Sequence, residues 1–66
     1  MDLVALEEYE KLTPRQQGYV VYLQAELPGS GLRGHQGNPY PPGSRGATEW
    51  DRGARVACLQ VQDAEE

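Results

Sequence analysis

Few side chains in this 66-residue sequence are of the types that usually carry out catalysis. Its one histidine, His35, lies in a glycine-rich segment, with Glu26 the nearest acid before it and no acid in the ten residues that follow. Its one cysteine, Cys58, falls on an apolar helical stripe, which favours packing over reactivity. Adjacent acids, which are Glu7 with Glu8 and Glu65 with Glu66, do not converge on one site. The sequence therefore predicts no catalytic residue.

Metal and cofactor sites are not predicted either. Residues 29–34, Gly-Ser-Gly-Leu-Arg-Gly, superficially resemble a phosphate-binding loop, but no strand precedes them and no lysine with serine or threonine follows. No Cys/His cluster has the spacing of a zinc site, and a single cysteine cannot form an internal disulfide. We expect no metal and no cofactor, and a binding or regulatory role in place of an enzymatic one.

Four side chains are suited to recognising a partner. An aromatic ring and guanidinium groups can stack on a partner surface and hydrogen-bond to it. We expect such a recognition edge to be formed by Tyr40, Arg45, Arg52 and Arg55. Tyr40 is equally suited to holding its own loop against the helices, and the sequence leaves both roles open.

The formal net charge is −4 at pH 7, from six basic and ten acidic side chains, but it is unevenly distributed. Acids concentrate in residues 1–12 and 63–66, whereas residues 28–46 hold Arg33 and Arg45 and no acid. A net-acidic chain is not drawn to nucleic acid by its long-range field, so we expect no DNA partner. The acidic ends either keep the chain soluble or dock on a basic partner surface.

The spacing of apolar residues predicts an all-α protein. Two main helices are expected at about 14–27 and 45–62, with a short helix at about 3–12 before them. The connecting residues, 28–43, hold five of the eight glycines and four of the five prolines, which excludes regular structure there. All 66 residues then form one small helical domain, with a disordered acidic tail at 63–66.

Capping residues mark the starts of these helices. Asp2 is placed to cap the first, and Ser44 to cap the third. Thr13 is the expected N-cap of the second helix, with Pro14 in its first position and Gln16 placed to complete a capping box.

The apolar stripes of the two main helices predict the core. In the second helix, Gln17 and Gln24 are expected to point away from it. In the third helix, Gly46 and Gly53 are expected to admit another backbone or an aromatic ring at close range. The expected core residues are Tyr19, Leu23, Leu27, Trp50, Gly53 and Ala57.

So short a chain buries only about 60% of the surface that it exposes when unfolded, and its core is marginal. Either part of the chain stays disordered, or a partner, such as a second copy in a homodimer, completes the core. No apolar run has the roughly 18 residues of a membrane helix, and no basic segment opens the chain as in a secretory signal. With a lone thiol that suits a reducing compartment, these features predict a cytoplasmic protein that does not enter membranes.

Three motifs resemble the ribosome modulation factor family and its small phage- and plasmid-borne relatives. They are Gly18-Tyr19, Asn38-Pro39-Tyr40 and Trp50-x-x-Gly53-x-Arg55-x-Ala57, and the resemblance covers about residues 15–60. It implies two helices joined by a connector. The sequence departs from the ribosome-binding members in its acidic net charge, in a longer connector and in Ala54, where those members tend to carry an aromatic residue.

The resemblance implies a non-enzymatic regulator that binds the small ribosomal subunit, where family members favour dimerised, inactive ribosomes. It also leaves two alternatives. One is a protein encoded by a phage or mobile element that has the same fold and inhibits a host protein. The other is a small ATP-dependent enzyme that modifies an antibiotic, an activity assigned to one group of relatives.

Overall fold

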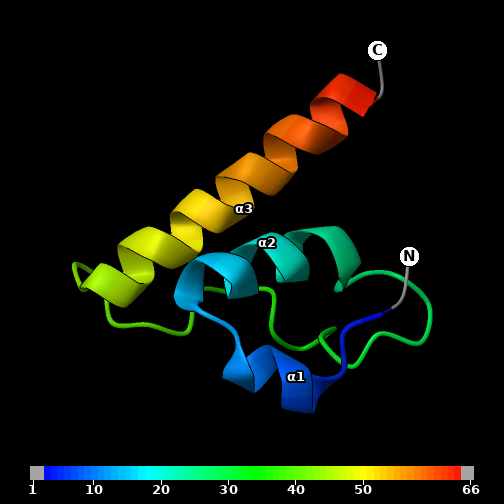
Figure 1. The fold of residues 1–66 in the computed structure, drawn as a ribbon, viewed down its shortest axis with the longest axis horizontal. Helices are drawn as coiled ribbons and strands as arrows, with labels where there is room; N and C mark the ends of the chain where they lie inside the picture. Colours follow the sequence, from blue (N-terminus) through cyan, green and yellow to red (C-terminus); the bar gives the residue numbers. More distant parts are fainter. Residues whose placement is uncertain (1–2, 65–66) are drawn as a thin grey trace.

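The computed structural model describes residues 3–64 of the chain. Within this range the chain forms three helices, α1 (Leu6–Lys11), α2 (Pro14–Gln24) and α3 (Arg45–Ala64), and no strand. α2 packs against α3, and α1 lies against α2 on the side away from α3 (Figure 1). The predicted all-α fold, with two main helices and a short one before them, is confirmed.

α1 is shorter than the predicted 3–12 helix. It begins at Leu6, and its N-cap Ala5 has no side chain that could bond the first turn. Ala5 is extended, and before it the Val4 N–H donates to Gln24 Oε1 of α2 at 2.8 Å. The expected cap, Asp2, lies outside the described residues, and a start at Leu6 contradicts its assignment.

α2 starts as predicted but ends early. The Gln16 N–H donates to Thr13 Oγ1 at 3.3 Å, and the Thr13 N–H donates to Gln16 Oε1 at 3.2 Å, which completes the capping box. The helix ends at Gln24, where the chain turns toward a glycine with φ of +82°, Gly29. The prediction that Leu27 belongs to the helix and the core is wrong, because Leu27 follows the turn and is 41% exposed.

Two glutamines form part of the buried face of α2, contrary to the prediction that they point away. Gln17 is 6% exposed and Gln24 is 5% exposed. Gln17 Nε2 donates to the Tyr9 carbonyl at 2.9 Å, so each of these amides ties a segment near α1 to α2. Two predicted core residues of α2, Tyr19 and Leu23, are only half-buried.

Paired glycines set the contact between α2 and α3. A Cβ on Gly53 would lie 2.8 Å from the Arg15 carbonyl carbon, and a Cβ on Gly18 would lie 2.9 Å from the Trp50 carbonyl carbon. The two backbones therefore touch where the helices meet, as expected for Gly53. Trp50 and Ala57 are buried on the same side of α3, which confirms both as core residues.

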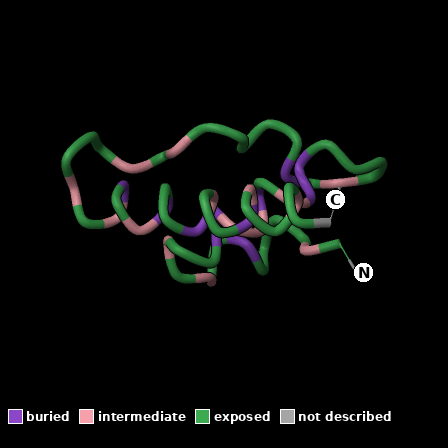
Figure 2. The backbone as a smooth tube through the Cα atoms, turned by 90° about the horizontal axis from the view of Figure 1, so that it is seen from above, coloured by how far each residue is buried: buried purple, intermediate pink, exposed green. Residues whose placement is uncertain are grey.

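The connector between α2 and α3 is irregular, as predicted, but it is anchored at several points. Leu32 is completely buried in the core, which the sequence did not indicate. The ring of Tyr40 packs against Gly46, which confirms the expectation that this glycine admits a group at close range. Figure 2 shows the buried positions gathered where the helices and this connector meet, while most of the connector is exposed.

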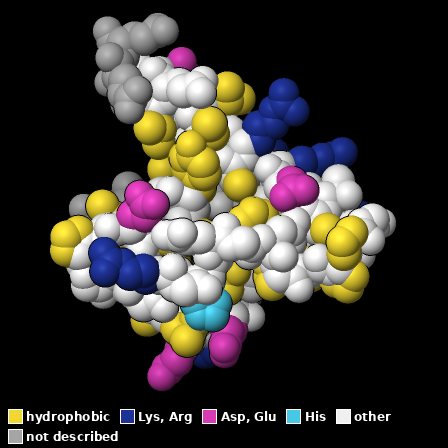
Figure 3. Space-filling view, turned by 180° about the vertical axis from the view of Figure 1, so that it is seen from behind, with side chains coloured by type: hydrophobic (Ala, Val, Ile, Leu, Met, Phe, Trp, Pro, Cys, Tyr) yellow, Lys and Arg dark blue, Asp and Glu magenta, His cyan; other side chains and the backbone are white. Residues whose placement is uncertain are grey.

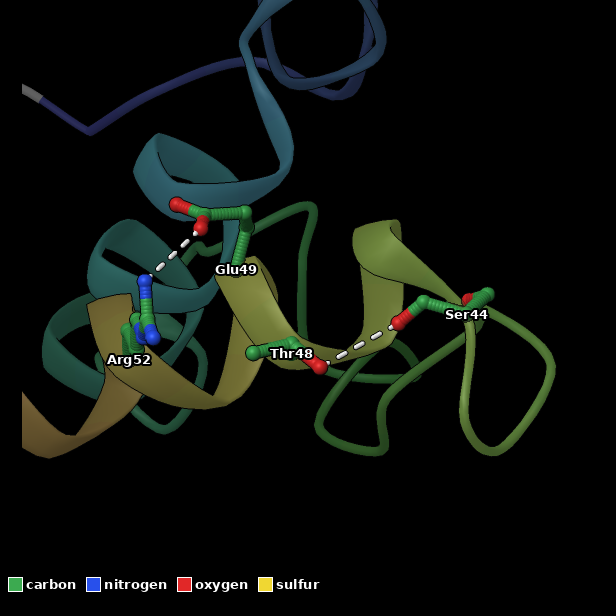
Figure 4. A network of polar contacts seen from close by, with 4 residues as sticks. All are labelled: Ser44, Thr48, Glu49 and Arg52. Atoms are coloured by element: carbon green, nitrogen blue, oxygen red, sulfur yellow. Dashed lines mark hydrogen bonds and ion pairs between the residues drawn. The ribbon is translucent and has the colours of Figure 1, made fainter.

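α3 begins at the predicted cap and runs past its predicted end. The Ala47 N–H donates to Ser44 Oγ at 3.1 Å, and Thr48 Oγ1 donates to the Ser44 carbonyl at 3.3 Å (Figure 4). At its other end α3 includes residues 63 and 64, so the prediction that these two belong to a disordered tail is wrong. Residues 65–66 of the predicted tail lie outside the described residues. α3 is longer than α2, and its last turns project beyond the rest of the molecule (Figure 1).

Candidate binding surface on α3

Three of the four predicted recognition residues share the outer side of α3. Arg45, Arg52 and Arg55 are exposed, and they form what we call the arginine face. Arg52 follows Arg45 by seven residues, almost two full turns, and Arg55 lies one turn further. Helical geometry places all three on the side of α3 opposite the buried Trp50. The three arginines therefore lie on one side of α3, and their role in recognition stays a prediction.

The first half of α3 holds two acids, Glu49 and Asp51, and only Glu49 pairs with an arginine of this face. Glu49 Oε1 lies 3.1 Å from Arg52 Nη1, one turn away on the same helix (Figure 4). Asp51 Oδ1 accepts a hydrogen bond from Asn38 Nδ2 at 3.0 Å, on the connector side. Within the described chain, Arg45 and Arg55 make no hydrogen bond or ion pair, so they carry the uncompensated charge of the face.

Tyr40, the fourth predicted residue, has a structural role in this arrangement. Its hydroxyl donates to Gln17 Oε1, and its backbone N–H donates to Asn38 Oδ1 at 3.1 Å. Asn38 in turn donates to the Ala47 carbonyl at 2.9 Å, so the Asn38–Tyr40 segment is fixed to the first turns of α3. Of the two roles that the sequence left open, these contacts support the one in which Tyr40 holds the connector against the helices. A contact between the half-buried ring and a partner stays a prediction.

An open groove of about 450 Å³ lies beside the arginine face, between the start of α2 and the middle of α3. Its lining is mainly apolar, with Arg15 and Gln16 as polar members, and the remaining residues are Leu12, Tyr19, Val20, Gly53 and Val56. Tyr19 closes one end, where its hydroxyl donates to Gln60 Oε1 of α3. Gly53 lies at the floor of this groove, at the point where the backbones of α2 and α3 touch.

Two exposed apolar residues of α3 were missed by sequence reasoning. Val56 is 36% exposed and Leu59 is 53% exposed, although both belong to the helix that provides much of the core. Hydrophobic side chains gather on the projecting end of α3, with basic side chains standing out from its flank (Figure 3). Leu59 falls on the side of α3 opposite the buried Trp50, and Val56 lies at the edge of the groove, so α2 covers neither side chain.

A second open cavity, of about 290 Å³, lies on the other side of α2. Trp50 and Ala54 contribute to it from α3, Tyr22 from α2, and Gln36 from the connector. The Trp50 Nε1 and Tyr9 hydroxyl groups are fully buried and have no hydrogen-bond partner among the described residues.

The remaining candidates for chemistry are dispersed. His35 is exposed and packs its ring against Tyr9, with the ring centroids 5.7 Å apart. Cys58 is a free, half-buried thiol. No three His, Cys, Asp or Glu side chains come together as a metal site in residues 3–64. Over the same residues, no helix is both long and apolar enough to span a membrane.

Comparison with protein-family models, curated proteins and solved structures finds no match to this chain.

Proposed function

We propose that this chain is a small, non-enzymatic regulatory protein of the cytoplasm that acts on ribosomes or translation. The motifs that resemble the ribosome modulation factor family support this function. The observation that carries it is the arginine face, because Arg45 and Arg55 are exposed on one side of α3 and have no acidic partner in the described chain. Such a pair is suited to the phosphates of a ribosomal surface.

The chemistry of the side chains supports an anionic partner. A guanidinium group binds phosphate oxygens with two parallel hydrogen bonds and stays charged at any physiological pH. The acids of α1, including Glu7 and Glu8, lie on the far side of α2, so they oppose this charge only weakly through the screening solvent (Figure 1). Few phosphate contacts fit on so short a face. Binding should consequently be modest and sensitive to salt.

Co-sedimentation with purified small ribosomal subunits at two salt concentrations tests this proposal. We expect the wild-type chain to sediment with subunits at low salt and to be released at higher salt. A variant with Arg45→Glu and Arg55→Glu should lose binding at both. In the single variants Arg45→Glu and Arg55→Glu, which should keep weaker binding, the lost phosphate contact should lower the slope of log affinity against log salt by about one unit.

The control is Arg33→Glu, which reverses an exposed arginine of the connector outside the arginine face and changes the net charge as much as the single α3 variant Arg55→Glu, with which it is compared. This variant should retain binding to within about threefold, because it changes the net charge but removes no contact. Equal loss of binding in the control and in the single α3 variant would show that only net charge matters. Either that result or the absence of co-sedimentation at low salt would overturn the proposal.

A further inference from the structure

The outer side of α3 carries a second pattern beside the arginines. Arg52, Val56, Leu59 and Asp63, which we call the outer stripe, follow one another at intervals of four, three and four residues. This spacing keeps four side chains on one side of a helix and is the spacing of residues that meet a partner helix in a coiled coil. The two central members are apolar and the two outer members carry opposite charges.

The central pair of the outer stripe, Val56 and Leu59, is exposed to solvent. Leu59 is the most exposed large hydrophobic side chain in the described chain, at 53%, and Val56 is 36% exposed. Val56 also forms part of the apolar groove between α2 and α3. Burying these side chains against another apolar surface would be favourable by about 25 cal/mol per Å² removed from water.

We propose that two copies of this chain pair through their outer stripes, with the two α3 helices antiparallel. A two-fold axis at the level of the bond between Ala57 and Cys58 places Val56 of each copy opposite Leu59 of the other. The same axis places Arg52 of each copy opposite Asp63 of the other. Every member of the stripe thus meets a complementary residue, as an isologous dimer requires.

Charge decides the direction of the pairing. In a parallel pair each residue of the stripe would face its own copy, so arginine would meet arginine and aspartate would meet aspartate. Like charges in register are destabilising, whereas two Arg52–Asp63 pairs flank the apolar centre of the antiparallel arrangement. The acceptor is available, since Asp63 is exposed and makes no ion pair with any described residue.

The monomer leaves room for this partner. The last turns of α3 project beyond α2, so a second helix can lie along them without meeting the rest of the molecule (Figure 1). In this arrangement Leu59 of the second copy lies at Val56, at the edge of the groove. Arg52 already pairs with Glu49, but its side chain is 64% exposed, and an exposed pair of this kind is worth at most about 1 kcal/mol. Arg52 can therefore also reach Asp63 of the second copy.

The expected dimer is weak and reversible. The outer stripe spans only about 16 Å of helix, which is much less than the contact of a permanent dimer. Dissociation constants in the micromolar range are typical of such small interfaces, so the dimer should be populated only at the upper end of accessible concentrations. Its formation is measured on the chain alone and does not depend on ribosome binding, so either proposal can fail without the other.

Sedimentation equilibrium from about 5 to about 500 µM tests the pairing, because a reversible dimer shows a mass that rises with concentration. Leu59→Gln should raise the dissociation constant at least about tenfold, since each dimer buries this side chain twice. Its control, Leu27→Gln, changes another exposed leucine, 41% exposed and far from the stripe, and should leave the dissociation constant unchanged. A monomer throughout this range, or equal effects of the two substitutions, would overturn the proposal.

Charge reversal tests the direction independently of the apolar contact. Arg52→Asp and Asp63→Arg should each weaken the dimer about tenfold, because each places two like-charge pairs in the antiparallel interface. The double variant should return to within about threefold of wild type. All these residues are exposed, and circular dichroism should show unchanged helix content. A double variant as weak as the single ones would exclude the proposed register.

Disulfide formation supplies a direct test of register in a Cys58→Ser background. A chain with Val56→Cys and a tagged chain with Leu59→Cys are mixed and oxidised. The antiparallel pairing predicts a crosslink between the two different chains, because these positions face each other. Crosslinks only between identical chains would instead show the parallel arrangement and refute the antiparallel one.

Discussion

Substituting Gly53 by alanine should separate α2 from α3. An added Cβ would lie 2.8 Å from the Arg15 carbonyl carbon, 3.0 Å from the Tyr19 nitrogen and closer still to the Arg15 oxygen. Carbon–oxygen contacts normally begin near 3.3 Å, so the two backbones must move apart by more than about 1 Å. Because these atoms belong to the backbone of a helix, no side-chain rotation can relieve the clash.

The energetic balance of this substitution can be estimated. Replacing glycine by alanine inside a helix favours folding by about 1 kcal/mol. Overpacking a well-packed contact costs about 1–3 kcal/mol and occasionally more, and loosening Trp50 adds lost burial. Because the clash is between two backbones, we take the upper end of the overpacking cost, about 3 kcal/mol, and after the helix gain of about 1 kcal/mol we expect a net loss of about 2 kcal/mol in the free energy of unfolding. In so small a domain that loss lowers the unfolding midpoint by at least about 10 °C.

Thermal and urea unfolding, followed by circular dichroism and by the fluorescence of Trp50, measures the effect. Two other glycines provide matched controls. A Cβ on Gly46 would meet only the ring of Tyr40, at 2.7 Å, and a ring can shift, so Gly46→Ala should cost less. A Cβ on Gly34 would meet nothing within 4 Å, so Gly34→Ala should be close to neutral. A Gly53→Ala variant as stable as the Gly34→Ala variant would refute the inferred backbone contact.

Two further predictions concern the core. Tyr40→Phe should lower the free energy of unfolding by about 1–3 kcal/mol, because it leaves buried Gln17 Oε1 without its donor. This cost should vanish in a Gln17→Ala background. In the control, Tyr19→Phe removes an exposed hydrogen bond and should change the free energy of unfolding by less than about 1 kcal/mol. Trp50→Ala should cost about 3–5 kcal/mol, enough to unfold much of the chain, and the loss of helix measured by circular dichroism should be larger than for Trp50→Phe.

Local signals in the sequence predicted local structure well. The capping box of Thr13 and Gln16 and the cap at Ser44 involve residues only three positions apart, and both are found. Gly46 and Gly53 were expected to admit a ring or a backbone, and each does so. These features could be predicted because glycine and short capping side chains have few other roles inside or before a helix.

Long-range contacts explain the failures. Gln17 and Gln24 are polar, and their spacing predicts that they face solvent. Their amides instead hydrogen-bond to backbone groups 8 and 20 residues away, which offsets the cost of removing them from water. Leu32 is apolar and lies among glycines, and nothing local indicates that the connector returns it to the core. Leu27 failed because a turn after Gln24 removes it from the helical face.

The candidate surface on α3 was predicted only in part, because one of its features is local and the other depends on long-range packing. The three arginines of α3 fall on the polar side of an amphipathic helix, and that follows from helical spacing alone. The exposure of Val56 and Leu59 does not, because it depends on which side of α3 packs against α2. An apolar residue on the outer side of a predicted helix becomes a candidate contact only once its neighbours are known to leave it uncovered.

The net charge of −4 describes the chain but not the surface that a partner would meet on α3. The acids of α1 are separated from α3 by α2, and Asp51 is turned toward the connector by its bond to Asn38. Pairing through the outer stripe would neutralise Arg52 and Asp63 together, while Arg45 lies outside the paired stretch and Arg55 at its flank. A dimer would consequently present two copies of the uncompensated arginines. Two such sites held at a fixed separation bind a polyanion more tightly than one, so substitutions that prevent pairing should also weaken ribosome binding if both proposals hold.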